Sequence, residues 1–230
     1  MALTKFNYNS FDVTPAASKA LAFNSDADGL TTMAGSSQIL IKTLTASSSA
    51  TLSFVHGSSD VVLDDTYPIY KFVFNNIHPQ TDDKDFTFQG SIDAGSSYGV
   101  TTTSTYFVSG HGEGDDAWDA GNPAYDAPIG SGYPDWHLEQ ETSFQTIADR
   151  IGSNADQCAS GELWLFNPSS TTFVKQFMSR ASCYYSYDYE FNIYAAGYFN
   201  NTNDVDAIQF KMNSGNIDAG TIKLYGIKDS

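Results

Sequence analysis

The sequence has few charged residues, and basic residues are especially scarce. Of 230 residues, 11 are Lys or Arg and 27 are Asp or Glu, so the formal net charge is −16. A strongly acidic surface repels nucleic-acid phosphates and anionic lipid headgroups. No segment approaches the roughly 20 consecutive apolar residues of a membrane span. We therefore expect no direct nucleic-acid binding and no membrane insertion. The first residues, "MALTKFNYNSFDV", contain no apolar core typical of a secretion signal.

Cysteine is also scarce, since the chain contains just Cys158 and Cys183. Two cysteines do not form a disulfide framework, and these two lack the spacing of a zinc site. If "LWLFNPSSTTFV" is a hairpin that turns at residues 167–170, Cys183 lies opposite Asn154 rather than Cys158. This register favours two free thiols, with a Cys158–Cys183 disulfide as the alternative.

Two motifs that carry catalysis are missing. The sequence contains no phosphate-binding Gly-Lys-Ser/Thr loop and no H-E-x-x-H zinc motif. Four histidines, His56, His78, His111 and His137, are scattered without the spacing of metal ligands. We expect a chain without enzymatic activity, cofactor or metal; a glycan depolymerase is the least favoured alternative, because it needs paired carboxylates held in a cleft.

Aromatic residues are abundant, at 14% of the chain, with 16 Phe and 14 Tyr. They recur at alternate positions: "YKFVFNNI" places Tyr70, Phe72 and Phe74 on one face of a strand and Lys71 and Asn75 on the other. Alternation with period two indicates half-buried β-strands. The final "TIKLYGI" is likewise expected to complete a sheet.

About ten such strands, separated by turn residues, predict an all-β fold, a double-sheet β-sandwich of jelly-roll type. Residues 1–37 are rich in small polar side chains and are expected to form an N-terminal arm or attachment segment, followed by a sandwich domain over 38–230. Residues 109–141 are expected to form one long surface loop. Helix should be rare, because "TSFQTIADRI" at 142–151 is the one segment with helical spacing.

The 109–141 segment contains the most unusual local pattern, in which carboxylates alternate with aromatic rings. Aromatic rings can stack on the faces of sugars while carboxylates accept hydrogen bonds from their hydroxyls. Three interpretations remain: the rings pack on the sandwich or on a neighbouring subunit, the segment binds a glycan or receptor, or the acids bind a hard cation such as Ca²⁺. The candidate contact residues are Asp115, Asp116, Trp118, Asp119, Tyr125 and Trp136.

Longer stretches of the chain resemble a known class of proteins. They are "FNSDADGLTTMAGSSQILIKTLTASSSATLSFVHGSSDVVLDDTYPIYKFVFNNIHPQTDDKDFTFQGS", "GELWLFNPSSTTFVKQF" and "IQFKMNSGNIDAGTIKLYGIK". These stretches resemble virion structural proteins of tailed marine bacteriophages, of the kind found in cyanophage-like podoviruses and their relatives. The similarity covers most of residues 20–108 and 160–228, and it is weakest over 109–141.

The resemblance implies a structural protein on the exterior of a virion, such as a tail fibre, a fibre adaptor or a capsid decoration subunit. It also implies assembly in the cytoplasm of the bacterial host, with other virion proteins and copies of the chain as partners. The surplus of aromatic residues, including "CYYSYDYEF" at 183–191, suits burial between copies, for which we expect a homotrimer. The alternative function is a receptor-recognition module that binds a host surface glycan.

Overall fold

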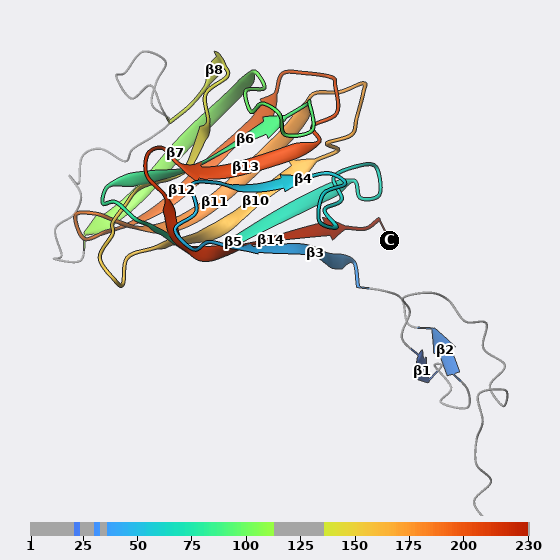
Figure 1. Ribbon diagram of the computed structural model, residues 1–230, viewed down its shortest axis with the longest axis horizontal. Helices are drawn as coiled ribbons and strands as arrows, with labels where there is room; N and C mark the ends of the chain where they lie inside the picture. The colour runs from blue at the N-terminus through green and yellow to red at the C-terminus, as the bar shows by residue number, and fades with distance from the viewer. Residues whose placement is uncertain (1–20, 24–29, 33–35, 113–135, 230) are drawn as a thin grey trace, which may run out of the picture. The chain divides into compact units, whose positions relative to one another are not determined.

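The computed structural model describes residues 21–23, 30–32, 36–112 and 136–229, and every regular element in them is a β-strand (Figure 1). The all-β class expected from the sequence is therefore confirmed. Because the described residues contain no helix, none of them form a helix long and apolar enough to cross a membrane. The chain divides into two compact units, Met1–Ser37 and Gln38–Ser230.

The described residues of the first unit form one short antiparallel pair of strands. Strand β1 (Leu21–Phe23) pairs with β2 (Leu30–Thr32), with Leu21 opposite Thr32. Its proposed role as an arm or attachment segment stays a prediction.

The second unit contains twelve strands in one hydrogen-bonded, antiparallel arrangement. They are β3 (Gln38–Thr45), β4 (Leu52–Val55), β5 (Ile69–Pro79), β6 (Lys84–Ser91), β7 (Thr102–Gly112), β8 (Glu139–Glu141), β9 (Gln145–Ile151), β10 (Ala159–Phe166), β11 (Lys175–Tyr185), β12 (Tyr189–Phe199), β13 (Ala207–Met212) and β14 (Ile217–Ile227).

These strands form two layers, which can be followed in Figure 1, and the layers join where β9 meets β11. The larger sheet has the order β3-β14-β5-β10-β11-β12-β7-β8, and the smaller has the order β4-β13-β6-β9. The register between them consists of one residue pair, Tyr185 of β11 and Ile151 of β9. A sheet that bends through such a corner covers its own apolar face, so the molecule is a double-layered sandwich, close to a closed barrel.

Phenylalanine rings fill the space between the layers. Phe210 of β13 is fully buried, and its ring centroid lies 5.4 Å from that of Phe72 and 5.6 Å from that of Phe86. Phe54 of β4 packs edge-on against Phe72 at 5.3 Å. Each buried ring of this kind contributes about 1.5–3 kcal/mol to folding. The alternating pattern predicted from the sequence is confirmed at β5, where Tyr70, Phe72 and Phe74 are buried.

The apolar segment near the end of the sequence has a central place in the sheet. Strand β14 lies between β3 and β5, with Ile222 opposite Leu44 on one side and Phe74 on the other. Ile222 and Leu224 are fully buried. The expectation that this segment completes a sheet is thus confirmed, and β3 is connected to the rest of the sheet through it.

The helix expected at 142–151 was a wrong prediction, because residues Gln145–Ile151 form strand β9. This strand is buried on both faces, so it shows no alternation of polar and apolar residues. Arg150 has a positive φ of 44°, and the pairing with β6 shifts register, which places Ile147, Ala148 and Ile151 in the core at a spacing that imitates a helix. Tertiary packing, which the sequence pattern does not reveal, decides this segment.

The segment 109–141, expected to be one long loop, contains strand residues at both of its ends. Strand β7 continues to Gly112 and pairs with β12, and Glu139–Glu141 form the short edge strand β8. Residues 113–135 lie outside the described part of the chain.

The predicted hairpin register was also wrong. Strand β10 ends at Phe166 and β11 begins at Lys175, so the connection is longer than a turn at 167–170 and shifts the pairing. Cys183 lies opposite Ala159 instead of Asn154. Cys158 and Cys183 are both free thiols: Cys183 is buried, while Cys158 is half-buried beside the backbone of Tyr184.

Candidate functional site

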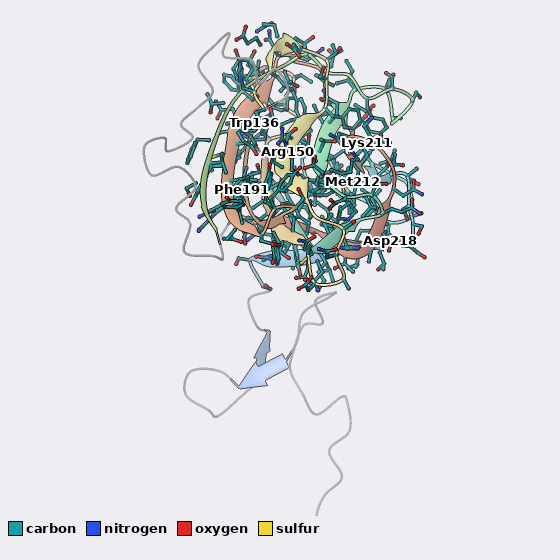
Figure 2. All side chains as sticks on the ribbon, turned by 90° about the vertical axis from the view of Figure 1, so that its left-hand side faces the viewer. Trp136, Arg150, Phe191, Lys211, Met212 and Asp218 are labelled. Carbon is teal, nitrogen blue, oxygen red and sulfur yellow. The ribbon has the colours of Figure 1, made fainter. Side chains whose placement is uncertain are left out.

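Most of the acidic and aromatic site expected from the sequence lies outside the described residues. This applies to Asp115, Asp116, Trp118, Asp119 and Tyr125. The sixth residue, Trp136, is described, and Figure 2 labels it at the end of the sandwich that faces the viewer.

Trp136 packs against the body of the sandwich. Its ring centroid lies 5.4 Å from that of Tyr106, a buried residue of β7, and its carbonyl accepts a hydrogen bond of 2.8 Å from Gln145 Nε2. The residue is half-buried and adds to the core cluster. Trp136 therefore covers the end of the core. For this residue, the contacts agree with the first of the three interpretations, in which the rings pack on the sandwich.

The histidines whose side chains are described take part in local structure. His56 Nδ1 accepts a hydrogen bond of 3.1 Å from the backbone N–H of Leu63, and His78 Nδ1 lies 2.7 Å from the carbonyl of Gln157. His137 lies 3.3 Å from Glu139. Among the described residues, no three His, Cys, Asp or Glu side chains are grouped in a way that could bind a metal ion.

Two buried carboxyl groups meet where β6 and β9 pair. Asp149 is 2% exposed and shares a hydrogen bond with Asp85. The Asp85 carboxylate also accepts hydrogen bonds of 2.9 Å from the backbone N–H of Arg150 and from Asn213 Nδ2. Burial and the neighbouring charge of Asp85 raise the pKa of Asp149 to about 8. At neutral pH, Asp149 therefore carries a proton.

The surroundings of this pair are closed to a substrate. Tyr106 and Cys183 are 1% exposed, and burial raises the pKa of both side chains, with the charge of Asp149 as a second cause. A buried thiol with a raised pKa is a poor nucleophile. Arg150, labelled in Figure 2, is partly exposed and donates to the Tyr185 hydroxyl at 2.9 Å. These polar side chains lie at the corner where the two sheets join, and two of their buried atoms, Tyr106 Oη and Asp149 Oδ1, have no hydrogen-bond partner within the described part of the chain.

The outer face of the larger sheet, which points away from the smaller sheet, is the most unusual exposed region of the sandwich. Two adjacent rows of side chains cross it from strand to strand. The first, here the Met178 row, contains Leu40, Tyr225, Lys71, Trp164, Met178, Ala196 and Thr105. The second, here the Arg180 row, contains Thr43, Lys223, Val73, Glu162, Arg180, Tyr194 and Phe107.

Charged and aromatic side chains lie against one another across these rows. Lys71 Nζ is 2.6 Å from Glu162 Oε2 and lies 4.5 Å from the centre of the Trp164 ring, whose Nε1 donates to Glu162 at 3.1 Å. Partial burial opposes ionisation of Glu162, but the hydrogen bonds from Lys71 and Trp164 outweigh it and lower the pKa of its carboxyl group. Lys71 and Glu162 are therefore both charged and satisfied within the face.

The second half of the Arg180 row repeats this arrangement. The guanidinium carbon of Arg180 lies 5.3 Å from the centre of the Tyr194 ring, and Tyr194 stacks on Phe107 with ring centroids 4.7 Å apart and an angle of 11°. A cation over an aromatic face and two stacked rings are both favourable contacts. Even so, Phe107 remains 48% exposed.

A shallow groove of about 470 Å³ opens on this face over β7, β11 and β12. Ala196 lies between Met178 and Thr105 in its row, and its small side chain leaves the hollow between larger neighbours. Apolar and polar groups both line the groove. Besides these three residues, it is lined by side chains that include Phe166, Gln176, Tyr198 and Thr103.

Comparison with known proteins identifies no family for this chain. No family model, curated protein or solved structure matches it.

The outer face was missed by reasoning from the sequence, although its signal is present there. Trp164, Met178 and Tyr194 each stand at the position that alternates with a buried neighbour, where a polar residue is usual. A search for large side chains on the solvent side of expected strands would find them. These side chains form adjacent rows because of the strand order, and the sequence does not reveal that order.

Proposed function

We propose that the chain is a non-enzymatic structural protein of a bacteriophage virion, carried on the exterior as a tail fibre, a fibre adaptor or a capsid decoration subunit. The observation that carries this proposal is the apolar and aromatic outer face of the larger sheet. A single chain leaves Met178 51% exposed and Phe107 48% exposed there. Exposed apolar surface of this kind is typical of sites of protein contact.

Two further observations support the proposal. The resemblance expected from the sequence is to virion structural proteins of tailed phages, and a double-layered sandwich of antiparallel strands suits a structural role. A strongly acidic protein on the outside of a capsid needs no affinity for the genome.

The test is the presence of the chain in purified particles of the phage that encodes it. Mass spectrometry of particles banded in a density gradient should detect the chain in stoichiometric amount. Antibodies against the sandwich should then label the capsid surface or the tail in electron micrographs. A chain that stays in the lysate and is missing from intact particles would refute the proposal.

A second function, recognition of a host surface glycan, is favoured by the groove at Ala196. Its mixture of Met178, Tyr198 and Gln176 suits a sugar ring, which has an apolar face and a polar rim. Replacing Ala196 with Trp fills the hollow and should abolish binding on a glycan array, whereas Ala196→Ser should retain it. Equal signals from the two variants would exclude the groove as the glycan site.

A further inference from the structure

Exposed apolar side chains are concentrated on the outer face of the larger sheet. Among the described residues, five large apolar or aromatic side chains are classed as exposed: Leu40, Phe107, Phe173, Met178 and Tyr187. Three of them belong to the two rows defined above, Leu40 and Met178 to the Met178 row and Phe107 to the Arg180 row. Phe173 and Tyr187 lie in connections between strands.

The rows are too wide for a small ligand. The Met178 row crosses seven neighbouring strands, from β3 to β7. Because neighbouring strands lie about 4.8 Å apart, the row extends over roughly 29 Å. The groove of about 470 Å³ at Ala196 occupies one part of this width. A sugar in the groove leaves Leu40 uncovered, whereas the sheet of another protein can cover the whole row.

Charge indicates which protein fits. The five central strands β5, β10, β11, β12 and β7 present two basic and two acidic side chains on this face: Lys71, Arg180, Glu162 and Glu190. With Lys223 of β14, which belongs to the Arg180 row, the two rows and Glu190 carry three basic and two acidic side chains, in a chain whose net charge is −16. Two copies repel each other wherever their acidic surfaces meet, but this repulsion is weak on the outer face, which carries charges of both signs. A face that carries charges of both signs can also place opposite charges near one another in a two-fold contact.

The face is already ordered before contact. Lys71, Glu162 and Trp164 hold one another, and Arg180 lies over the stacked rings of Tyr194 and Phe107. Side chains that are already fixed lose little entropy when they are covered by a partner.

We propose that the outer face of the larger sheet binds the same face of a second copy of this chain, in a two-fold contact centred on the Met178 row. This inference deepens the proposed function by naming the contact between copies. It differs from the homotrimer expected from composition, because a three-fold contact joins two different patches on each copy, whereas a two-fold contact joins one patch to itself.

Sedimentation of the purified full chain at micromolar concentration tests the contact. The wild-type chain should sediment at twice its 25.0 kDa mass. Met178→Glu and Phe107→Glu each place two carboxylates in the symmetric contact and should raise the dissociation constant at least about thirtyfold, as loss of an interface anchor does. Phe173→Glu is the matched control: it changes a 71% exposed ring in a connection between strands and should leave the mass unchanged.

A cross-link tests the geometry independently of affinity. In a Cys158→Ser background, Met178→Cys should form covalent dimers with a short bis-maleimide, whereas Phe173→Cys should not. Cys183 is buried and should not react. Circular dichroism and the urea midpoint show that each variant is folded, and a misfolded Phe107 variant leaves Met178→Glu and the cross-link to decide.

A wild-type chain of 25.0 kDa mass, a trimer, or a dimer that survives Met178→Glu and cross-links equally at both positions would overturn the inference. Failure here is distinguishable from failure of the proposed function. A monomer that is found in purified particles contradicts the inference alone, and a dimer that is missing from particles contradicts the proposed function alone.

Discussion

The two faces of the larger sheet are built by the same strands but differ in how their side chains are stabilised. On the inner face, Phe72, Phe177 and Leu224 are at most 1% exposed and pack against the smaller sheet. On the outer face, Trp164 and Tyr194 are half-exposed and pack against Lys71 and Arg180. Because successive side chains of a strand point to opposite faces of the sheet, neighbouring residues of the same strand belong to the two different faces. The comparison teaches that the inner face determines the free energy of unfolding, while the outer face is free to carry a function.

Removing a central ring of the inner face should have the largest effect. Phe210 has ring contacts with four other phenylalanines, Phe54, Phe72, Phe86 and Phe88. Phe210→Ala leaves a cavity and should lower the free energy of unfolding by about 3–5 kcal/mol. Urea denaturation measures this. Phe107→Ala, the matched change on the outer face, should cost less than about 1 kcal/mol when both variants are compared as monomers. Equal losses would mean that the two faces contribute alike to stability.

The second prediction concerns pH. The pKa of Asp149 is about 8 in the folded chain, because the side chain is buried beside Asp85. An unfolded Asp titrates near 4, so the folded state binds one more proton than the unfolded state between these values. This contribution to stability is complete below pH 4 and declines, at up to about 1.4 kcal/mol per pH unit, until the pH passes 8. Asp149→Asn cannot ionise and keeps a donor toward Asp85.

Urea midpoints of the wild type and Asp149→Asn between pH 5 and 9 measure this dependence. The wild type should lose stability as the pH rises, and the variant should show a flatter profile. Asp93→Asn is the control, whose profile should run parallel to that of the wild type between pH 5 and 9 because Asp93 titrates only below about pH 4. Hydrogen bonds from Ser97 and Ser91 lower the pKa of the exposed Asp93 to about 2, so its contribution is lost as the pH falls. Parallel profiles for the wild type and Asp149→Asn would show that the pKa of Asp149 is not raised in the folded chain.

The smallest effect is expected at the ion pair of the outer face. Glu162 is 38% exposed at its side chain, and water screens its attraction to Lys71. Glu162→Gln keeps the shape and a hydrogen-bonding oxygen, and should change the free energy of unfolding of the monomer by about 0–1 kcal/mol. A thermal melt of the variant beside Glu162→Ala checks this. A loss as large as that of Phe210→Ala would place the ion pair among the main sources of stability.

The fold class could be predicted from the sequence because alternation is a local property. Tyr70, Phe72 and Phe74 alternate with Lys71, Val73 and Asn75, and their strand has one buried face. Strand β9 defeats the same reasoning, since both of its faces are covered and its hydrogen-bond register is irregular. Hairpin register failed for a related reason. The length of the connection between Phe166 and Lys175 fixes the pairing, and turn residues alone do not reveal that length.

The candidate sites depend on strand order, which is a property of the whole fold. Asp85 and Asp149 are distant in sequence and meet because β6 pairs with β9. Met178 and Leu40 share a row because β14, β5 and β10 lie between their strands. No local pattern contains this information. The acidic and aromatic segment, by contrast, is conspicuous in the sequence but lies largely outside the described residues, apart from Trp136.

The position of β14 also has a mechanical consequence. Gln38 at the start of β3 lies opposite Ile227 at the end of β14, so the two ends of the sandwich unit emerge side by side. Tension applied between these ends loads the hydrogen bonds between β3 and β14 one after another, beginning with those nearest Gln38 and Ile227. Opposed pulling along two strands would instead load all the bonds together. If force enters the sandwich at Gln38, β3 is the first strand to be peeled away, and the remaining sheet keeps its core.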